Sequence, residues 1–210
     1  MQNNGALIVI SGFSGAGKGT LVKKMLEDYD RFALSISMTT RSPREGEVEG
    51  RDYFFVSEDT FTETIREDGL LEYANYCGNF YGTPKAYVWG KMQMGVDVIL
   101  EIEVQGALQI KEKYPSAILM FVTPPDITEL KTRLEGRGTE DEETVLKRLA
   151  RAGEEVKFVD KYDFLLVNDD LEECEKRAVS YIDAAKASPL RNESFINQLK
   201  EELEGFSKGV

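Results

Sequence analysis

The stretch ALIVISGFSGAGKGTLVKKMLE, residues 6–27, decides the fold. Residues 6–10 are apolar and rich in β-branched side chains, which is typical of a buried parallel strand. A glycine-rich turn follows, and residues 20–27 then carry apolar side chains at helical spacing. A strand, a glycine-rich turn and a helix in this order form the setting of a phosphate-binding loop.

The turn itself has the composition that phosphate binding requires. Its glycines let several backbone N–H groups point at one anion, and the following helix adds partial positive charge at its N-terminus. The pattern GxxxxGK[ST] is met at Gly12, Gly17 and Lys18, but position 19 is glycine and the hydroxyl comes one place later, on Thr20. We expect Thr20 to reach a Mg²⁺ ion directly or through water. The predicted triphosphate site comprises Gly12, Phe13, Ser14, Gly15, Ala16, Gly17, Lys18, Gly19 and Thr20.

Further apolar runs alternate with helical patterns along the rest of the chain. The runs lie at residues 96–102, 117–122 and 164–167, and the helical patterns at residues 87–94, 104–112, 127–134, 142–158 and 171–187. This alternation predicts a three-layer α/β fold, with a parallel central sheet covered by helices on both faces.

Two segments interrupt this alternation. Residues 37–83 contain short aromatic runs and turn residues, which predict a small mixed β/α lobe with mostly antiparallel strands around a helix at residues 58–67. Gly136 begins a short polar break that we interpret as a mobile lid, covering about residues 136–152. The predicted core is therefore residues 5–36 and 84–187, followed by a weakly helical tail at residues 188–210.

Composition excludes several classes of function. The 26 basic and 38 acidic residues give a net charge of −12, so nucleic acid and anionic membranes are not expected partners. The absence of histidine excludes Ser-His-Asp and Cys-His catalysis, and two distant cysteines form no usual zinc framework. The N-terminus lacks the basic region of a signal peptide, and we expect a cytoplasmic location. A homo-oligomer is left open.

Charged residues of the lobe suggest a second binding site. Arg41 and Arg44 flank Pro43 on a short turn, and two guanidiniums so placed suit a phosphate dianion, although a solvated surface pair is equally expected. Glu72 lies among large apolar residues and could accept from the N1–H and amino group of guanine, whereas adenine N1 would repel it. Ser37 or Thr83 could then donate to guanine O6. The alternative for Glu72 is an exposed strand position.

Three further places carry candidate side chains. Glu101 and Glu103 follow a buried run at the expected carboxyl edge of the sheet, where they could hold Mg²⁺ through water, bind a ligand, or merely end the strand. Arg148 borders the apolar face of its helix and is expected to reach inward, whereas Arg151 is expected to face solvent. Residues 168–170 end a strand and begin a helix, so helix capping explains either aspartate there.

Taken together, these motifs resemble the guanylate kinase family, which phosphorylates GMP with ATP. The resemblance runs from about residue 6 to 185, through the segments SGAGKGT, TTRSPR, GRDYFF, GNFYGT, LEGRGT and VNDD. It implies a P-loop kinase fold, direct in-line phosphoryl transfer, dGMP as a further acceptor, and Mg²⁺ as cofactor. Glu103 departs from the aspartate common in the family, for which we expect a shift in geometry without loss of function.

The resemblance also implies a role for each matching residue. Lys18, Arg41, Arg137 and Arg148 would be catalytic, and Arg137 and Asn168 would complete the ATP site of residues 12–20. The implied GMP site comprises Ser37, Arg41, Arg44, Tyr53, Glu72, Tyr81, Gly82, Thr83, Glu101 and Glu103.

Three alternatives are weighed against this interpretation. The first is a kinase of similar fold for AMP or dTMP, which Glu72 disfavours in the case of adenine. The second is a non-catalytic peptide-binding module, which the complete phosphate loop with Lys18 disfavours. The third is a P-loop NTPase switch, which would have no need of a second nucleotide site.

Overall fold

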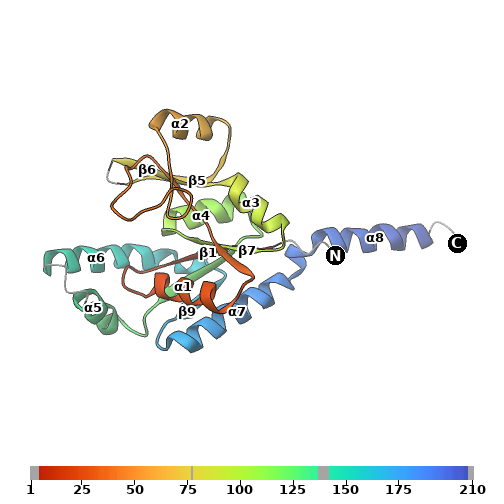
Figure 1. Ribbon diagram of the computed structural model, residues 1–210. Helices are drawn as coiled ribbons and strands as arrows, with labels where there is room; N and C mark the ends of the chain where they lie inside the picture. The colour runs from red at the N-terminus through yellow and green to blue at the C-terminus, as the bar shows by residue number, and fades with distance from the viewer. Residues whose placement is uncertain (1–4, 77, 137–141, 208–210) are drawn as a thin grey trace.

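A parallel sheet forms the centre of the computed structural model, which describes residues 5–76, 78–136 and 142–207 (Figure 1). Within these residues the sheet has five strands, in the order β2 (Phe32–Leu34), β7 (Asp97–Glu101), β1 (Leu7–Gly12), β8 (Ile118–Thr123) and β9 (Phe164–Val167). Val9 in β1 pairs with Leu100 on one side and Leu119 on the other. The strand β2 was not predicted, because it has only three residues and buries only Phe32.

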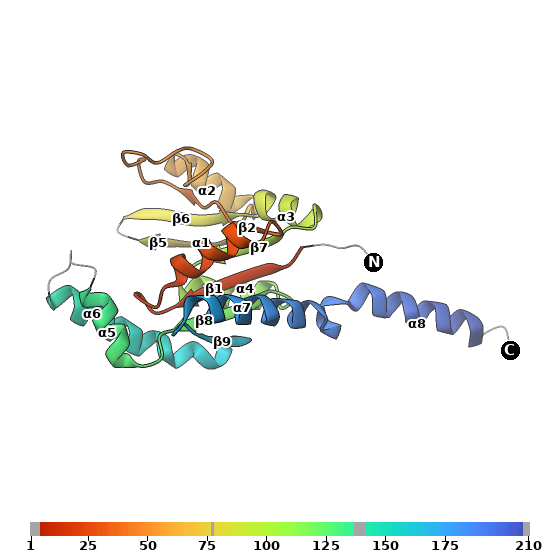
Figure 2. The same ribbon diagram turned by 60° about the horizontal axis from the view of Figure 1, so that its bottom comes forward.

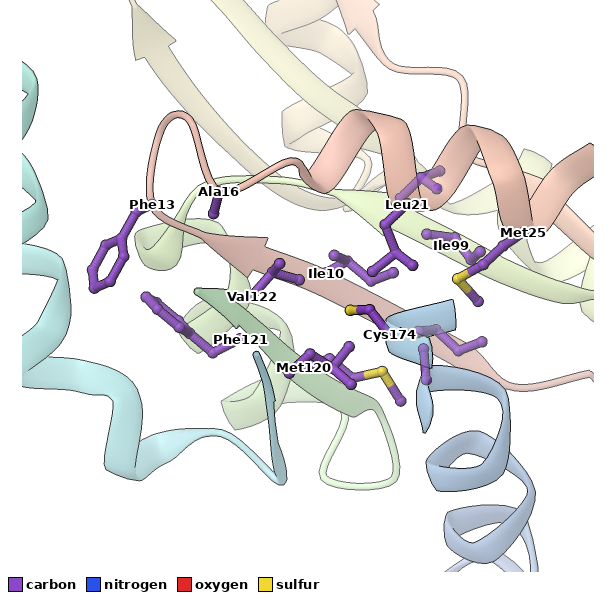
Figure 3. Packing of buried hydrophobic residues seen from close by; sticks show 14 of the residues in the cluster. Ile10, Phe13, Ala16, Leu21, Met25, Ile99, Met120, Phe121, Val122 and Cys174 are labelled. Atoms are coloured by element: carbon purple, nitrogen blue, oxygen red, sulfur yellow. The ribbon is translucent and has the colours of Figure 1, made fainter. Parts of the chain in front are cut away.

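Helices cover both faces of this sheet, as the alternation predicts. Helices α1 (Lys18–Asp28) and α7 (Leu171–Lys186) pack on the face that carries Ile8 and Ile10. Helices α3 (Lys85–Gln93) and α4 (Val104–Lys113) pack on the opposite face, against Leu7 and Val9. Figure 3 shows the first of these cores, where Leu21 and Met25 of α1 lie over Ile10 and Ile99, with Cys174 of α7 close by.

The lobe contains a second sheet, in the order β4 (Phe54–Phe55), β3 (Met38–Thr39), β6 (Asn79–Pro84) and β5 (Leu70–Tyr76). Strand β6 runs antiparallel to β3 and β5, whereas β3 and β4 are parallel. Helix α2 (Glu58–Arg66) begins after Ser57, whose hydroxyl accepts from the Thr60 amide, and it buries Phe61 in a stacked contact with Phe80. The lobe lies beside the main sheet with α2 outermost (Figures 1 and 2).

Two helices follow β8 near the end of the sheet that carries the phosphate loop. Helix α5 (Ile127–Glu135) is capped by Asp126, and its Leu130 and Leu134 lie against Gly15 of that loop. Helix α6 (Glu142–Glu155) was predicted to reach Phe158 but ends at Glu155, and a 3-10 helix, η1 (Val156–Lys161), continues the chain. The predicted lid residues 137–141, with Arg137, lie outside the described residues.

The tail leaves the main body of the molecule. A short 3-10 helix, η2 (Pro189–Arg191), precedes helix α8 (Glu193–Ser207), which extends away from the sheets in both views (Figures 1 and 2). None of the helices that the structure describes is long and apolar enough to cross a membrane.

Candidate active site

The phosphate loop follows the central strand β1 and ends where α1 begins. Gly15 and Gly17 have φ values of 89° and 88°, a left-handed conformation that glycine adopts most readily. A Cβ atom on Gly17 would lie 2.4 Å from Nδ2 of Asn168, so any larger residue would displace that side chain. The Lys18 ammonium donates to the carbonyls of Gly12 (2.8 Å) and Phe13 (3.1 Å) and thereby closes the loop. The loop is thus held in shape by hydrogen bonds between the Lys18 side chain and the loop's own backbone carbonyls.

Asn168 lies directly against this loop. Its side chain is buried, and Nδ2 donates to the Ala16 carbonyl at 2.8 Å. The contact makes Asn168 a support for the loop, while its implied role beside the ATP nucleoside stays a prediction. Of the two aspartates that follow, Asp170 caps α7 by accepting from the Glu173 amide at 2.9 Å.

Arg148 connects α6 to the phosphate loop, as its inward position on the helix predicts. One of its guanidinium nitrogens donates to the Ser14 hydroxyl at 2.6 Å. Because Ser14 lies within the loop, this contact brings a second cation to the place where phosphates are expected.

The arginine pair of the lobe is organised by a carboxylate that the sequence did not single out. Glu47 accepts from Arg41 at 2.8 and 3.0 Å and from the Arg44 amide at 2.7 Å. The hydrogen bond from Arg41 lowers the pKa of Glu47, and the same bond raises the pKa of Arg41. The Arg41 guanidinium also lies 5.3 Å from the centre of the Tyr53 ring. Nothing in the spacing of residues 41 and 47 indicates this pair in advance.

A cleft of about 620 Å³ opens between the lobe, the carboxyl end of β7 and helix α6. Seven residues of the predicted GMP site line it: Ser37, Tyr53, Glu72, Tyr81, Gly82, Glu101 and Glu103. The other three, Arg41, Arg44 and Thr83, are not among its lining residues. Arg151, which was expected to face solvent, also lines the cleft, and lining residues that sequence reasoning missed are Ala74, Asn75, Ile102, Val104, Gln105, Gly106, Glu154, Glu155 and Phe158.

Glu72 is the buried carboxylate of this cleft. Its side chain is 6% exposed, so the alternative of an exposed strand position is wrong. The Thr83 hydroxyl donates to Oε1 at 2.7 Å, while its predicted contact with a guanine base stays a prediction. Burial raises the pKa of Glu72, and the Thr83 hydrogen bond and the charge of Lys113 act in the opposite direction. The arrangement holds one carboxylate in a fixed orientation toward the cleft.

Two glycines make room for Glu72. A Cβ atom on Gly106, in α4, would lie 3.1 Å from Oε2 of Glu72, tighter than most real contacts. A Cβ atom on Gly82 would lie 3.0 Å from the Glu72 carbonyl oxygen and 2.8 Å from Leu70. Gly106 was missed because its partner comes from a strand 34 positions earlier, and only the packing of α4 on β5 brings them together.

Glu101 and Glu103 occupy different surroundings at the end of β7. The Glu101 carboxylate lies beside the start of α1, where a Cβ atom on Gly19 would be 3.6 Å from Oε1. Desolvation raises the pKa of Glu101, and the charge of Lys18 opposes that effect. Glu103 precedes α4 and pairs with Arg151 at 2.7 Å. Glu101 therefore stands between the phosphate loop and the cleft.

Arg151 is exposed, as the helical pattern predicts, with 49% of its side chain accessible, but it also has partners that the pattern did not indicate. Its guanidinium pairs with Glu103 and, at 3.0 Å, with Glu155 on its own helix. The helical pattern identified the apolar face correctly, but a long arginine side chain can reach across the edge of its helix to another element.

A phosphate loop on the central strand of a parallel sheet, with an inserted lobe over a separate cleft, is the arrangement expected of a P-loop kinase. The family model for guanylate kinase matches residues 4–185. The chain is 48% identical to a guanylate kinase of Latilactobacillus sakei over 96% of this chain and 98% of the other. It is 51% identical to one of Streptococcus thermophilus, over 88% of each chain.

A solved structure agrees with these sequence comparisons. The crystal structure of guanylate kinase from Anaplasma phagocytophilum matches with a TM-score of 0.69 at 31% identity, covering 90% of this chain and 89% of the other. The chain belongs to the guanylate kinase family.

Proposed function

We propose that this chain transfers the γ-phosphate of ATP to GMP, giving ADP and GDP. The observation that carries the proposal is Glu72, a buried carboxylate held by Thr83 in a cleft separate from the phosphate loop. A carboxylate in that position matches the adjacent N1–H and amino donors of guanine and would face the bare N1 acceptor of adenine. Membership of the guanylate kinase family supports the same pair of substrates.

The transfer is proposed to be direct and in line. A GMP phosphate oxygen attacks the γ-phosphorus, a new P–O bond forms, and the bond to the β-phosphate oxygen breaks to release ADP. Such a reaction needs positioning and charge neutralisation more than covalent chemistry. Lys18 and Arg148 lie at the phosphate loop and are proposed to neutralise the transferring group, with Arg137 joining them.

The acceptor phosphate is assigned to Arg41, Arg44, Tyr53 and Tyr81. Arg41 already lies over Tyr53, and Glu47 fixes the turn that carries both arginines. Because Arg41 and Arg44 do not line the open cleft, residues 37–83 and the lid are proposed to close over bound nucleotides and exclude water. The 2′-hydroxyl of the acceptor has no assigned contact, and dGMP is therefore proposed as a second acceptor.

Magnesium is proposed to arrive with ATP. Among residues 5–76, 78–136 and 142–207 no group of three or more acidic or cysteine side chains is arranged to hold a metal ion. Mg²⁺ commonly binds through one or two protein ligands together with substrate phosphates, and Thr20 and Glu101 fit that need. The bound ion would neutralise phosphate charge during transfer.

An ADP-release assay with ATP and Mg²⁺ tests this function, using GMP, AMP, dTMP or no acceptor. We expect rapid ADP release with GMP and little with the others. Turnover with AMP or dTMP instead would overturn the role of Glu72 in base selection. Release without any acceptor would identify an NTPase, and no release under any condition would favour a binding module.

A further inference from the structure

Helix α6 contacts both sides of the site from positions three residues apart. Arg148 donates to Ser14 in the phosphate loop at 2.6 Å, and Arg151 donates to Glu103 at the cleft at 2.7 Å. Residues three apart lie on neighbouring parts of a helix surface. A rotation or shift of α6 that breaks one contact would therefore disturb the other.

Arg151 is also surrounded by acidic side chains, whose negative charge it partly offsets. Glu101, Glu103, Glu154 and Glu155 all line the cleft that Arg151 lines. Glu155 is 8% exposed, and burial raises its pKa. Arg151 pairs with two of these carboxylates, so its charge offsets an acidic wall that would otherwise repel an incoming phosphate dianion.

We propose that Arg151 is a positioning residue for phosphoryl transfer. By pairing with Glu103 it ties α6 to the acceptor side of the cleft, which keeps Arg148 at Ser14, and its charge offsets part of the negative charge of the acidic wall. The inference deepens the proposed function and rests on it. It assigns Arg151 no contact with the transferring phosphoryl group.

A purely structural role for this pair is a weaker account of the geometry. The Arg151 and Glu103 side chains are 49% and 66% exposed, and ion pairs at such exposure contribute little to stability. Helix α6 also contains the ion pair of Lys147 with Glu143, four residues apart on the same helix at 2.6 Å, and both side chains are more exposed than those of Arg151 and Glu103. Lys147 is not a cleft-lining residue, which makes it a control for any general effect on the helix.

The test compares the variants Arg151→Met, Arg151→Lys and Lys147→Met in the GMP-dependent ADP-release assay. We expect Arg151→Met to lower kcat/KM for GMP by about tenfold, the scale of a coupled contact, while KM for ATP stays within about twofold. Arg151→Lys should recover part of the loss, and Lys147→Met should match the wild type. Circular dichroism and thermal unfolding identify any variant that fails to fold. If Arg151→Met fails to fold, the activities of Arg151→Lys and Glu103→Gln test the proposal in its place.

A double-variant cycle with Glu103→Gln separates positioning from additive effects. If the pair acts as a unit, Arg151→Met with Glu103→Gln is no worse than the more impaired single variant. Additive losses, or an Arg151→Met enzyme that matches Lys147→Met, would overturn the proposal. A wild-type protein without GMP-dependent ADP release would instead overturn the proposed function, so the two failures are distinguishable.

Discussion

The phosphate loop and the acceptor cleft are built in opposite ways. The loop takes its shape from one contiguous segment, with backbone N–H groups, left-handed glycines and Lys18 bonded to its own carbonyls. The cleft collects side chains from the lobe, the end of β7 and α6. The comparison teaches that the loop should be sensitive to added bulk and to loss of the cations that contact it, whereas the cleft should be sensitive to loss or displacement of its carboxylates.

Removing the arginine that links α6 to the loop should have the largest effect. Arg148→Ala is expected to lower kcat by about 10³-fold, by analogy with arginines that stabilise transferring phosphoryl groups. The measurement is steady-state ADP release with GMP and ATP, and Lys147→Ala on the same helix is the control. An Arg148→Ala enzyme with near-normal turnover would remove this residue from the catalytic set.

Added bulk in the loop should come next. Gly17→Ala combines a φ of 88° with a Cβ atom 2.4 Å from Asn168 Nδ2, and we expect a stability loss of about 2–4 kcal/mol with weakened ATP binding. Gly46→Ala has a φ of 86° with no atom near the added Cβ, and it should lose only about 1–2 kcal/mol. Thermal unfolding of both variants measures the difference, and equal losses would show that the Asn168 contact contributes nothing.

A smaller effect is expected where bulk meets the acceptor carboxylate. Gly106→Ala places a Cβ atom 3.1 Å from Glu72 Oε2, which should raise KM for GMP by roughly threefold to tenfold and leave KM for ATP unchanged. Gly90→Ala in α3 meets no atom within 4 Å and serves as the control. A change in KM for ATP as large as that for GMP would contradict the separation of the two regions.

The pH dependence should also distinguish the two regions. Burial raises the pKa of Glu72, so kcat/KM for GMP should begin to fall, as pH decreases, above the ordinary glutamate value of about 4.3. The contribution of Glu72 to folding stability should change with pH in the opposite direction. Because the folded protein holds this proton more tightly than the unfolded chain, protonation of Glu72 favours the folded state. A Glu72→Gln variant should lose this limb of the GMP profile, and an unchanged limb would assign it to another group.

The sequence predicted the loop better than the cleft for a physical reason. Residues 12–20 form a local structure, so the pattern of glycines with Lys18 carries the information in one segment. The parallel strands and helices of the core were also predicted, since their apolar runs have a clear periodicity. The strand Phe32–Leu34 was missed because three residues are too few to show a periodicity.

The partners of the cleft residues could not be predicted from one sequence. Gly106 meets Glu72, and Arg151 meets Glu103, only because separate segments pack together. Arg41 meets Glu47 through the conformation of the loop that carries both. The hydroxyl of Thr83 was one of two candidates, with that of Ser37, for donating to guanine, and in the structure it donates to Glu72. The charged residue types indicated that a binding site was present, whereas their contacts depend on the three-dimensional fold.

The most direct test of the account measures GMP and ATP binding separately by calorimetry, in the wild type and in Glu72→Gln. Loss of a buried carboxylate that is proposed to accept two hydrogen bonds from guanine should weaken GMP binding by about 10²-fold or more. ATP binding should stay within about twofold, because the phosphate loop is built without Glu72. Unchanged GMP binding, or equal weakening of both nucleotides, would contradict the assignment of the cleft to guanine.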